Sequence, residues 1–225
     1  GIVEGEPLRS YYGYKSNGLI RTQEDLDNSP HYSGKQIGDV WLLDVNGDGE
    51  VNADDRTIIG SPYPDIMYGA MGTVGYKNLT MQVQLQGVQG ALRDIRGGHN
   101  EGVLHYFTRW AMNHDRLALD RYHATKNPDG QYPRLTTNDA GNNLMFSDFW
   151  LSDASFLRIS NVNINYDFPV SLTEPMGIGS IAAYLSVQNL YTFTSFYGPE
   201  VDSTADVLTG VPQPRTWTFG LRVSL

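Results

Sequence analysis

The sequence predicts an all-β fold, the strands of a transmembrane β-barrel with long external loops. The first observation is strict alternation in segment 79–86, where Leu, Met, Val and Leu occupy one face and Thr and three Gln the other. Such period-two alternation indicates a strand between two different environments. The second is a similar segment, 217–225, that ends on apolar Leu225, whereas the termini of soluble proteins tend to fray. The third is that short and long connections alternate along the chain, as they do in outer-membrane barrels.

Composition narrows the function classes but does not separate a barrel from a soluble β protein. The 225 residues are 40% hydrophobic, and no stretch reaches the ~18 consecutive apolar residues that a membrane helix needs. The formal charge of -9 argues against nucleic-acid binding. The absence of cysteine excludes disulfides and thiolate metal sites. Segment 1–5 lacks the pattern of a signal peptide, so we expect the chain to lack its natural beginning.

The other expected strands follow in chain order. A segment within 3–14 is the first of six, and segment 67–76 forms a hairpin with 79–86 through Lys77 and Asn78. Segment 156–168 changes parity near Ser160, which predicts a β-bulge there. Segments 181–190 and 217–225 complete the set.

The connections between these strands differ in length on the two sides. If the C-terminus is periplasmic, the periplasmic connections are the short 77–78 and 169–179, and the external ones are 16–66, about 88–155 and 191–213. This asymmetry is typical of outer-membrane barrels. Six strands cannot close a barrel around a polar lumen, and open sheet edges are not tolerated in lipid. The barrel is therefore expected to be incomplete without strands from elsewhere.

Segment 44–55 fits a twelve-residue calcium loop. Gly49 at position six permits the sharp turn, and Glu50 at position seven offers its backbone carbonyl. The side-chain ligands at positions 1, 3, 5, 9 and 12 would be Asp44, Asn46, Asp48, Asn52 and Asp55. The loop departs from a sensor EF-hand in having Asp as its last ligand. The sequence predicts a structural Ca²⁺ site, and the alternative is a charged turn without metal.

A second candidate site lies in segment 101–122, which could hold a helix. Tyr106, Arg109 and Trp110 suit stacking on a sugar or anchoring a partner, and they are the candidate substrate-binding residues. The alternative is aromatic packing that stiffens a long loop. No nucleophile motif or zinc-binding histidine pair is present, so the sequence predicts no enzyme.

Several sequence blocks, taken in order, resemble one family. They are 5–7, 11–15, 38–40, 59–62, 75–78, 109–110, 147–161, 166–169, 187–190 and 214–221. In this order, and over essentially all of residues 1–225, they resemble the C-terminal third of the SusC/RagA-like TonB-dependent transporters of Bacteroidetes. A departure is Leu225, because such barrels usually end on an aromatic residue.

The resemblance implies a barrel of about 22 strands in the outer membrane, with its loops exposed at the cell surface. It also implies partners: an N-terminal remainder with a plug and the other strands, a SusD-like surface lipoprotein, and TonB. The implied function is TonB-dependent import of an oligosaccharide or peptide nutrient. The alternative is a secreted soluble β-sandwich that binds carbohydrate and carries a structural calcium. An extracellular hydrolase is a third possibility that no motif supports.

Overall fold

The computed structural model describes residues 4–5, 7–96, 116–136, 143–198, 200–201 and 213–224. The chain divides into two compact units. We call them the loop unit (Gly1–Tyr63, Leu92–Asp153 and Tyr197–Gly210) and the sheet unit (Pro64–Ala91, Ala154–Phe196 and Val211–Leu225).

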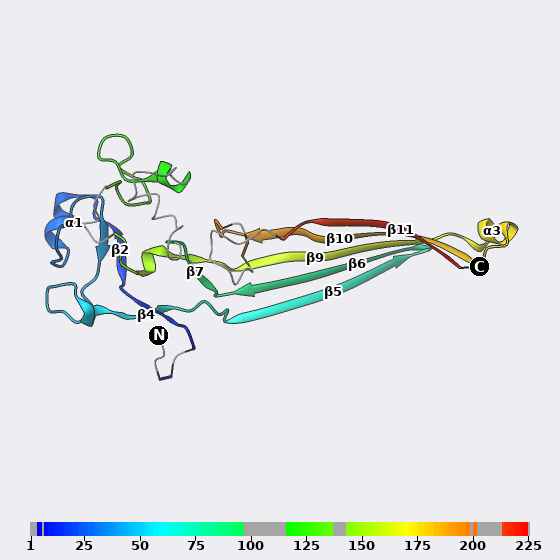
Figure 1. The fold of residues 1–225 in the computed structure, drawn as a ribbon, viewed down its shortest axis with the longest axis horizontal. Coiled ribbons are helices and arrows are strands. Elements are labelled where there is room, and N and C mark those ends of the chain that lie inside the picture. Colours follow the sequence, from blue (N-terminus) through cyan, green and yellow to red (C-terminus); the bar gives the residue numbers. More distant parts are fainter. Residues whose placement is uncertain are drawn as a thin grey trace. The chain divides into compact units, whose positions relative to one another are not determined.

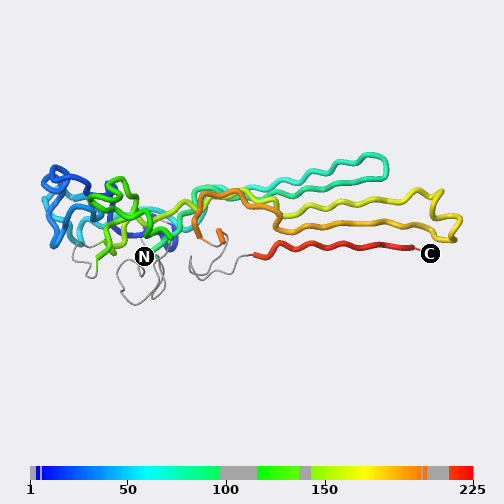
Figure 2. The backbone as a smooth tube through the Cα atoms, turned by 90° about the horizontal axis from the view of Figure 1, so that it is seen from above, coloured from blue at the N-terminus to red at the C-terminus, as the bar shows by residue number. Residues whose placement is uncertain are grey.

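The sheet unit is an antiparallel sheet of five strands in the order β11-β10-β9-β6-β5 (Figures 1 and 2). The strands are β5 (Ile66–Tyr76), β6 (Leu79–Gln89), β9 (Phe156–Asp167), β10 (Ser180–Thr194) and β11 (Thr216–Ser224). They contain 9 to 15 residues, which meets the roughly 9–11 residues that a tilted strand needs to cross a bilayer. Five of the six expected strands are therefore confirmed.

Short connections join the strands at one end of this sheet (Figure 2). Between β5 and β6 the chain turns at Lys77, whose φ of 52° is left-handed, and at Asn78. Between β9 and β10 lie the single-turn helix α3 (Val170–Thr173) and the 3₁₀ turn η4 (Glu174–Met176). At the opposite end, residues 90–155 and 195–215 connect the strands. The predicted asymmetry of connections is confirmed.

A bulge crosses the sheet at the position expected from the parity change. Gln84 of β6 pairs with Asn161, and the next residue, Leu85, pairs with Ile159, so Ser160 is the extra residue in β9. In β10 the register moves from Gln188 to Tyr191 over the same step. Asn189 lies in this second bulge with a φ of 52°, a conformation that Asn tolerates better than most residues.

The loop unit is built from short strand pairs and turns. The pairs are β1 (Tyr11–Gly13) with β4 (Thr57–Gly60), β2 (Ser16–Leu19) with β3 (Val40–Leu42), and β7 (Leu92–Asp94) with β8 (Leu151–Asp153). The helical segments are α1 (Gln23–Asn28), η1 (Ala53–Asp55), η2 (Arg116–Asp120) and η3 (Asp148–Trp150). A capping box starts α1, because the Thr22 side chain and the Asp25 carboxylate each bond the other's backbone N–H. The core includes Ile20, Val40, Leu42 and Trp150, all at most 1% exposed.

The expected strand within 3–14 is the one fold prediction that was wrong. The strand found within it, β1, has only three residues and pairs with β4 in the loop unit. Three residues span about 10 Å, which is too short for a barrel wall. The bulge between Tyr11 and Tyr12 further interrupts the alternation of the segment.

No helix in the described part of the chain is long and apolar enough to span a membrane.

Candidate functional sites

One face of the sheet unit is apolar and uncovered. Cross-strand pairs place the same kind of side chain side by side, as in Met81–Ile164–Leu185–Phe219. Phe219 is 73% exposed and Tyr76 is 70% exposed. In a β-sandwich this face would pack on a second sheet, but the described residues form no second layer over it. A face of this kind is suited to hydrocarbon chains.

Aromatic side chains lie at both ends of this apolar face. Tyr68 and Phe193 share one row across the sheet, and Tyr76 and Tyr166 share another. Tyr76 lies eight residues after Tyr68, and these eight steps span about 27 Å along the strand at ~3.4 Å per residue. Membrane barrels carry aromatic girdles at the two edges of an apolar band about 25 Å tall. The sheet therefore has the pattern of a barrel wall.

The opposite face of the sheet is a ladder of amides and hydroxyls. Gln82, Asn163 and Ser186 form one row, and the Nδ2 of Asn163 donates to the Oε1 of Gln82 at 3.3 Å. Arg158 lies on this face near the end of the sheet where the long connections attach. It is 2% exposed, and its Nε donates to the hydroxyl of Thr192 at 2.9 Å. Gln82, Gln84 and Gln86 thus lie on the polar face, as their alternation predicts, and this face suits an aqueous interior.

The calcium-loop candidates lie together between β3 and β4. The N–H groups of Gly47 and Gly49 both donate to the Asp44 carboxylate at 2.6 Å. Asp48 accepts from the N–H of Glu50 at 2.9 Å. Backbone hydrogen bonds tie the middle of the turn to the rest of the loop unit. The N–H of His31 donates to the carbonyl of Gly49, and the carbonyl of His31 accepts from the N–H of Val51, each at 2.9 Å.

Asp55, the last position of the loop, is buried and ionised. Burial alone would raise the pKa of its carboxyl, but hydrogen bonds from the N–H groups of Asn52, Val45 and Asn46 outweigh burial. The pKa therefore lies below the ordinary value, and contact with the Asp44 side chain lowers it further. The first and last carboxylates of the loop thus meet.

The donor set fits Ca²⁺ in chemistry and in number. Carboxylate, amide and backbone oxygens are the ligands that Ca²⁺ prefers, and six to eight are needed. The loop offers the side chains of Asp44, Asn46, Asp48, Asn52 and Asp55 and the carbonyl of Glu50. In this conformation the side chains bond the loop's own N–H groups. Among the described residues no three His, Cys, Asp or Glu side chains converge as a metal site.

A buried ion pair holds distant parts of the loop unit together. Asp39 is 0% exposed, and its carboxylate accepts from Arg134 Nε at 2.7 Å and from Asn143 Nδ2 at 2.8 Å. The N–H of Gln36 donates to its other oxygen at 2.8 Å. Burial, and secondly the nearby Asp39 carboxylate, raise the pKa of Tyr32. Sequence analysis did not identify this cluster, because its members lie up to 104 residues apart and share no local pattern.

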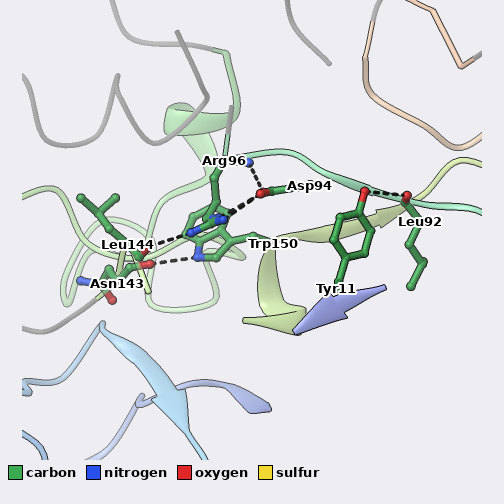
Figure 3. Close-up of polar contacts among 7 residues, drawn as sticks. All are labelled: Tyr11, Leu92, Asp94, Arg96, Asn143, Leu144 and Trp150. Atoms are coloured by element: carbon green, nitrogen blue, oxygen red, sulfur yellow. Dashed lines mark hydrogen bonds and ion pairs between the residues drawn. The ribbon is translucent and has the colours of Figure 1, made fainter. Parts of the chain in front are cut away.

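Figure 3 shows a second polar cluster, around Arg96. The guanidinium forms an ion pair with Asp94 at 2.8 Å and donates to the carbonyl of Leu144 at 3.0 Å. Nearby, Trp150 Nε1 donates to the carbonyl of Asn143 at 2.9 Å. Tyr11 donates to the carbonyl of Leu92 at 3.2 Å. The Arg96 bond joins segment 143–150 to the residues that follow β7, the Trp150 bond closes that segment on itself, and the Tyr11 bond ties β1 to β7. The other predicted site residues, Tyr106, Arg109 and Trp110, lie outside the described residues.

Sequence comparison relates the chain to TonB-dependent receptors. It is 28% identical over 236 residues to TonB-dependent receptor P26 of Formosa agariphila, covering 99% of this chain and 23% of that protein. It is 29% identical over 217 residues to TonB-dependent receptor SusC of Bacteroides thetaiotaomicron, covering 95% of this chain and 20% of that protein. The chain thus spans about a fifth to a quarter of the length of these relatives. No family model matches the sequence.

Structure comparison gives the same fold. The structure of the RagAB peptide importer in the open-open state matches 96% of this chain and 22% of that chain, with a TM-score of 0.66 and 20% identity. The structure of the RagAB peptide transporter matches 95% of this chain and 22% of that chain, with a TM-score of 0.67 and 23% identity.

Fold and comparisons agree on the class: the chain has the fold of part of a β-barrel wall, and the relatives it resembles in sequence are TonB-dependent receptors. SusC is among these relatives, in agreement with the family that the sequence blocks resemble. The barrel is incomplete in these residues, as predicted, because β5 and β11 are edges of the sheet. The relatives are receptors and transporters, so the prediction that the chain is not an enzyme is also confirmed.

Proposed function

We propose that this chain supplies barrel wall and surface-exposed loops to a transporter that imports an oligosaccharide or peptide nutrient across the outer membrane. The observation that carries the proposal is the two-faced sheet, apolar and aromatic-rimmed on one side and lined by amides on the other. The relatives named as TonB-dependent receptors and as a peptide importer support active uptake. The same proposal includes three partners: the N-terminal remainder of the transporter with its plug, TonB, and a SusD-like surface lipoprotein.

Cysteine labelling tests the proposed topology. The chain contains no cysteine, so single cysteines can be introduced into a cysteine-free form of the whole protein. We expect a membrane-impermeant maleimide to label Lys126→Cys, in the loop unit, on intact cells. The matched control is Leu172→Cys in α3, which is 58% exposed in the chain and should react only after the outer membrane is opened.

Labelling of Leu172→Cys and not of Lys126→Cys on intact cells would reverse the orientation. Release of the protein into the soluble fraction without detergent would reject the barrel and favour the secreted sandwich. Loss of growth on either an oligosaccharide or a peptide mixture, in a strain that lacks the protein, would assign the nutrient class.

We also propose that segment 44–55 binds one structural Ca²⁺. Supporting it are the spacing of the oxygen donors and the closeness of the Asp44 and Asp55 side chains, which occupy the first and last ligand positions. The ion would hold a turn that is bonded to His31 and leads directly into β4. Its role would be to give a long external loop one shape.

Removing a ligand should release the metal. We expect Asp44→Ala or Asp48→Ala to abolish bound calcium in the purified whole protein, measured by elemental analysis, and to make residues 16–66 more sensitive to protease. Glu24→Ala, an exposed acidic change on α1, should leave both unchanged. The lowered pKa of Asp55 keeps that carboxylate charged above about pH 4. Calcium should therefore stay bound at pH 5 and be lost as the pH falls through the pKa of Asp55 in the folded protein. Unchanged calcium content in Asp44→Ala would contradict the assignment of segment 44–55 as the calcium site.

A further inference from the structure

The loop unit contains a cavity of about 220 Å³, lined by Tyr12, Gly13, Tyr14, Arg56, Met145 and Phe146. A cavity of roughly 150 Å³ is enough to hold benzene, so this one can take a single ring with a substituent. It lies apart from the calcium-loop ligands, although Arg56 directly follows Asp55 in the chain.

The backbone walls of the cavity are fixed. The N–H of Tyr14 donates to the carbonyl of Phe146 at 2.8 Å, and the N–H of Asp148 donates to the carbonyl of Tyr14 at 3.0 Å. Gly13 permits this close approach, because a Cβ there would lie 2.3 Å from the Phe146 carbonyl oxygen. A site with fixed walls loses little conformational entropy when a ligand binds.

The aromatic walls are also held in place. Arg56 lies over the ring of the buried Tyr14, 5.3 Å from its centroid, and its Nε donates to the Tyr14 hydroxyl at 3.0 Å. Arg96 lies 4.2 Å from the centroid of Phe146. The ring of Tyr11 packs edge-on against Phe146 at 5.6 Å. The rings of Tyr14 and Phe146 are therefore each supported by a guanidinium.

The two guanidinium groups differ in charge balance. Arg96 is neutralised by Asp94. Arg56 forms no ion pair with another described residue, and within that part of the chain its one side-chain hydrogen bond uses Nε. A guanidinium has five N–H donors, so the Nη groups of this lining residue are available for a carboxylate, which they can bind through two parallel bonds.

The lining also indicates what should accompany the carboxylate. Tyr12, Met145 and Phe146 present mostly carbon, and the Tyr14 hydroxyl is already bonded to Arg56. A sugar ring would leave hydroxyl groups without partners, which costs about 1–3 kcal/mol for each buried group. An apolar ring has no such groups.

We propose that this cavity binds a carboxylate carried next to an aromatic or large apolar group, the chemistry shared by the C-terminal aromatic residue of a peptide and a free aromatic acid. The apolar group fills the cavity, and the carboxylate pairs with Arg56. This goes beyond the uptake function and does not depend on it, because a binding site in the loop unit can be measured without transport.

The test uses the detergent-purified whole protein and three probes: N-acetylphenylalanine, its neutral amide, and the tripeptide Ala-Ala-Phe. By calorimetry, N-acetylphenylalanine should bind at least about tenfold more tightly than the amide, since a charge-assisted pair is worth ~1.5–3 kcal/mol. Arg56→Gln should remove the preference, so that the acid and the amide bind with equal affinity. Arg116→Gln, which removes the same charge from an exposed position of η2, should change neither.

Phe146→Ala should weaken the acid and the amide together, because it removes the apolar wall. Binding of Ala-Ala-Phe at least as tight as that of N-acetylphenylalanine would identify a peptide terminus as the ligand, and exclusive binding of the small acid would identify a free acid. Equal affinity for acid and amide, an Arg56→Gln variant with unchanged affinity, or equally tight binding of glucuronate would each overturn the proposal. If one of these results overturned the cavity proposal while cysteine labelling and nutrient uptake were normal, the proposed function would still stand.

Discussion

Leu185→Arg is expected to prevent stable assembly of the protein in a membrane. Leu185 lies at the middle of the apolar face, paired with Ile164 on one side and Phe219 on the other. An arginine at the bilayer midplane on the lipid face of a barrel costs about 2–4 kcal/mol. We expect the folded, heat-modifiable species on gels to decrease strongly and the urea midpoint of unfolding in detergent to fall.

The neighbouring residue provides the control. Ser186 is on the same strand but on the polar face, between Asn163 and Thr218. Ser186→Arg introduces the same charge on the side that faces water, and it should leave assembly close to wild type. If both variants assembled equally well, the apolar face would not be in contact with lipid.

Asp39→Ala is expected to loosen the loop unit. The substitution removes the carboxylate that pairs with Arg134 and bonds Asn143, 95 and 104 residues away. Breaking a buried pair by removing one partner costs ~3–5 kcal/mol. Because the Arg134 side chain is 23% exposed and water can partly replace its partner, we expect the lower end, about 3 kcal/mol.

Hydrogen exchange in the whole protein measures this effect. We expect backbone amides near Arg134, such as its own N–H, which donates to the carbonyl of Gly38 at 2.8 Å, to exchange roughly a hundredfold faster in Asp39→Ala. Asp129→Ala removes an exposed carboxylate from the same segment and should leave exchange unchanged. The sheet unit should keep its protection in both variants, and unchanged protection near Arg134 would show that the ion pair is dispensable.

The sheet could be predicted from sequence because its information is local. Alternation fixes which side of a strand each residue faces, so β6 and β11 followed directly from their apolar positions. The parity change at Ser160 was visible for the same reason and is matched by the register. The segment within 3–14 misled because a few alternating residues fit a short strand of the loop unit as well as a barrel strand.

The loop unit could not be predicted in the same way. Asp39, Arg134 and Asn143 are brought together by tertiary folding, and no local repeat marks any of them as a partner of the others. The cavity likewise combines residues from β1, from the start of β4 and from segment 145–146. Only the calcium loop, whose donors lie within twelve consecutive residues, carries a pattern that can be read from the sequence.

The staggered bulges keep the apolar residues of three strands on one face where their registers change. From the pair Gln84–Asn161 to the pair Leu85–Ile159, β6 advances one residue, β9 two, and β10, from Gln188 to Tyr191, three. Deleting Ser160 would close the bulge and place Ile159 directly before Asn161, so the residues on either side would keep their faces. Deleting a regularly paired residue, such as Asn163, would put the residues next to the deletion on the wrong faces. Single-residue deletions in this sheet should therefore be tolerated better at Ser160 than at Asn163, and longer insertions should accumulate in the long connections.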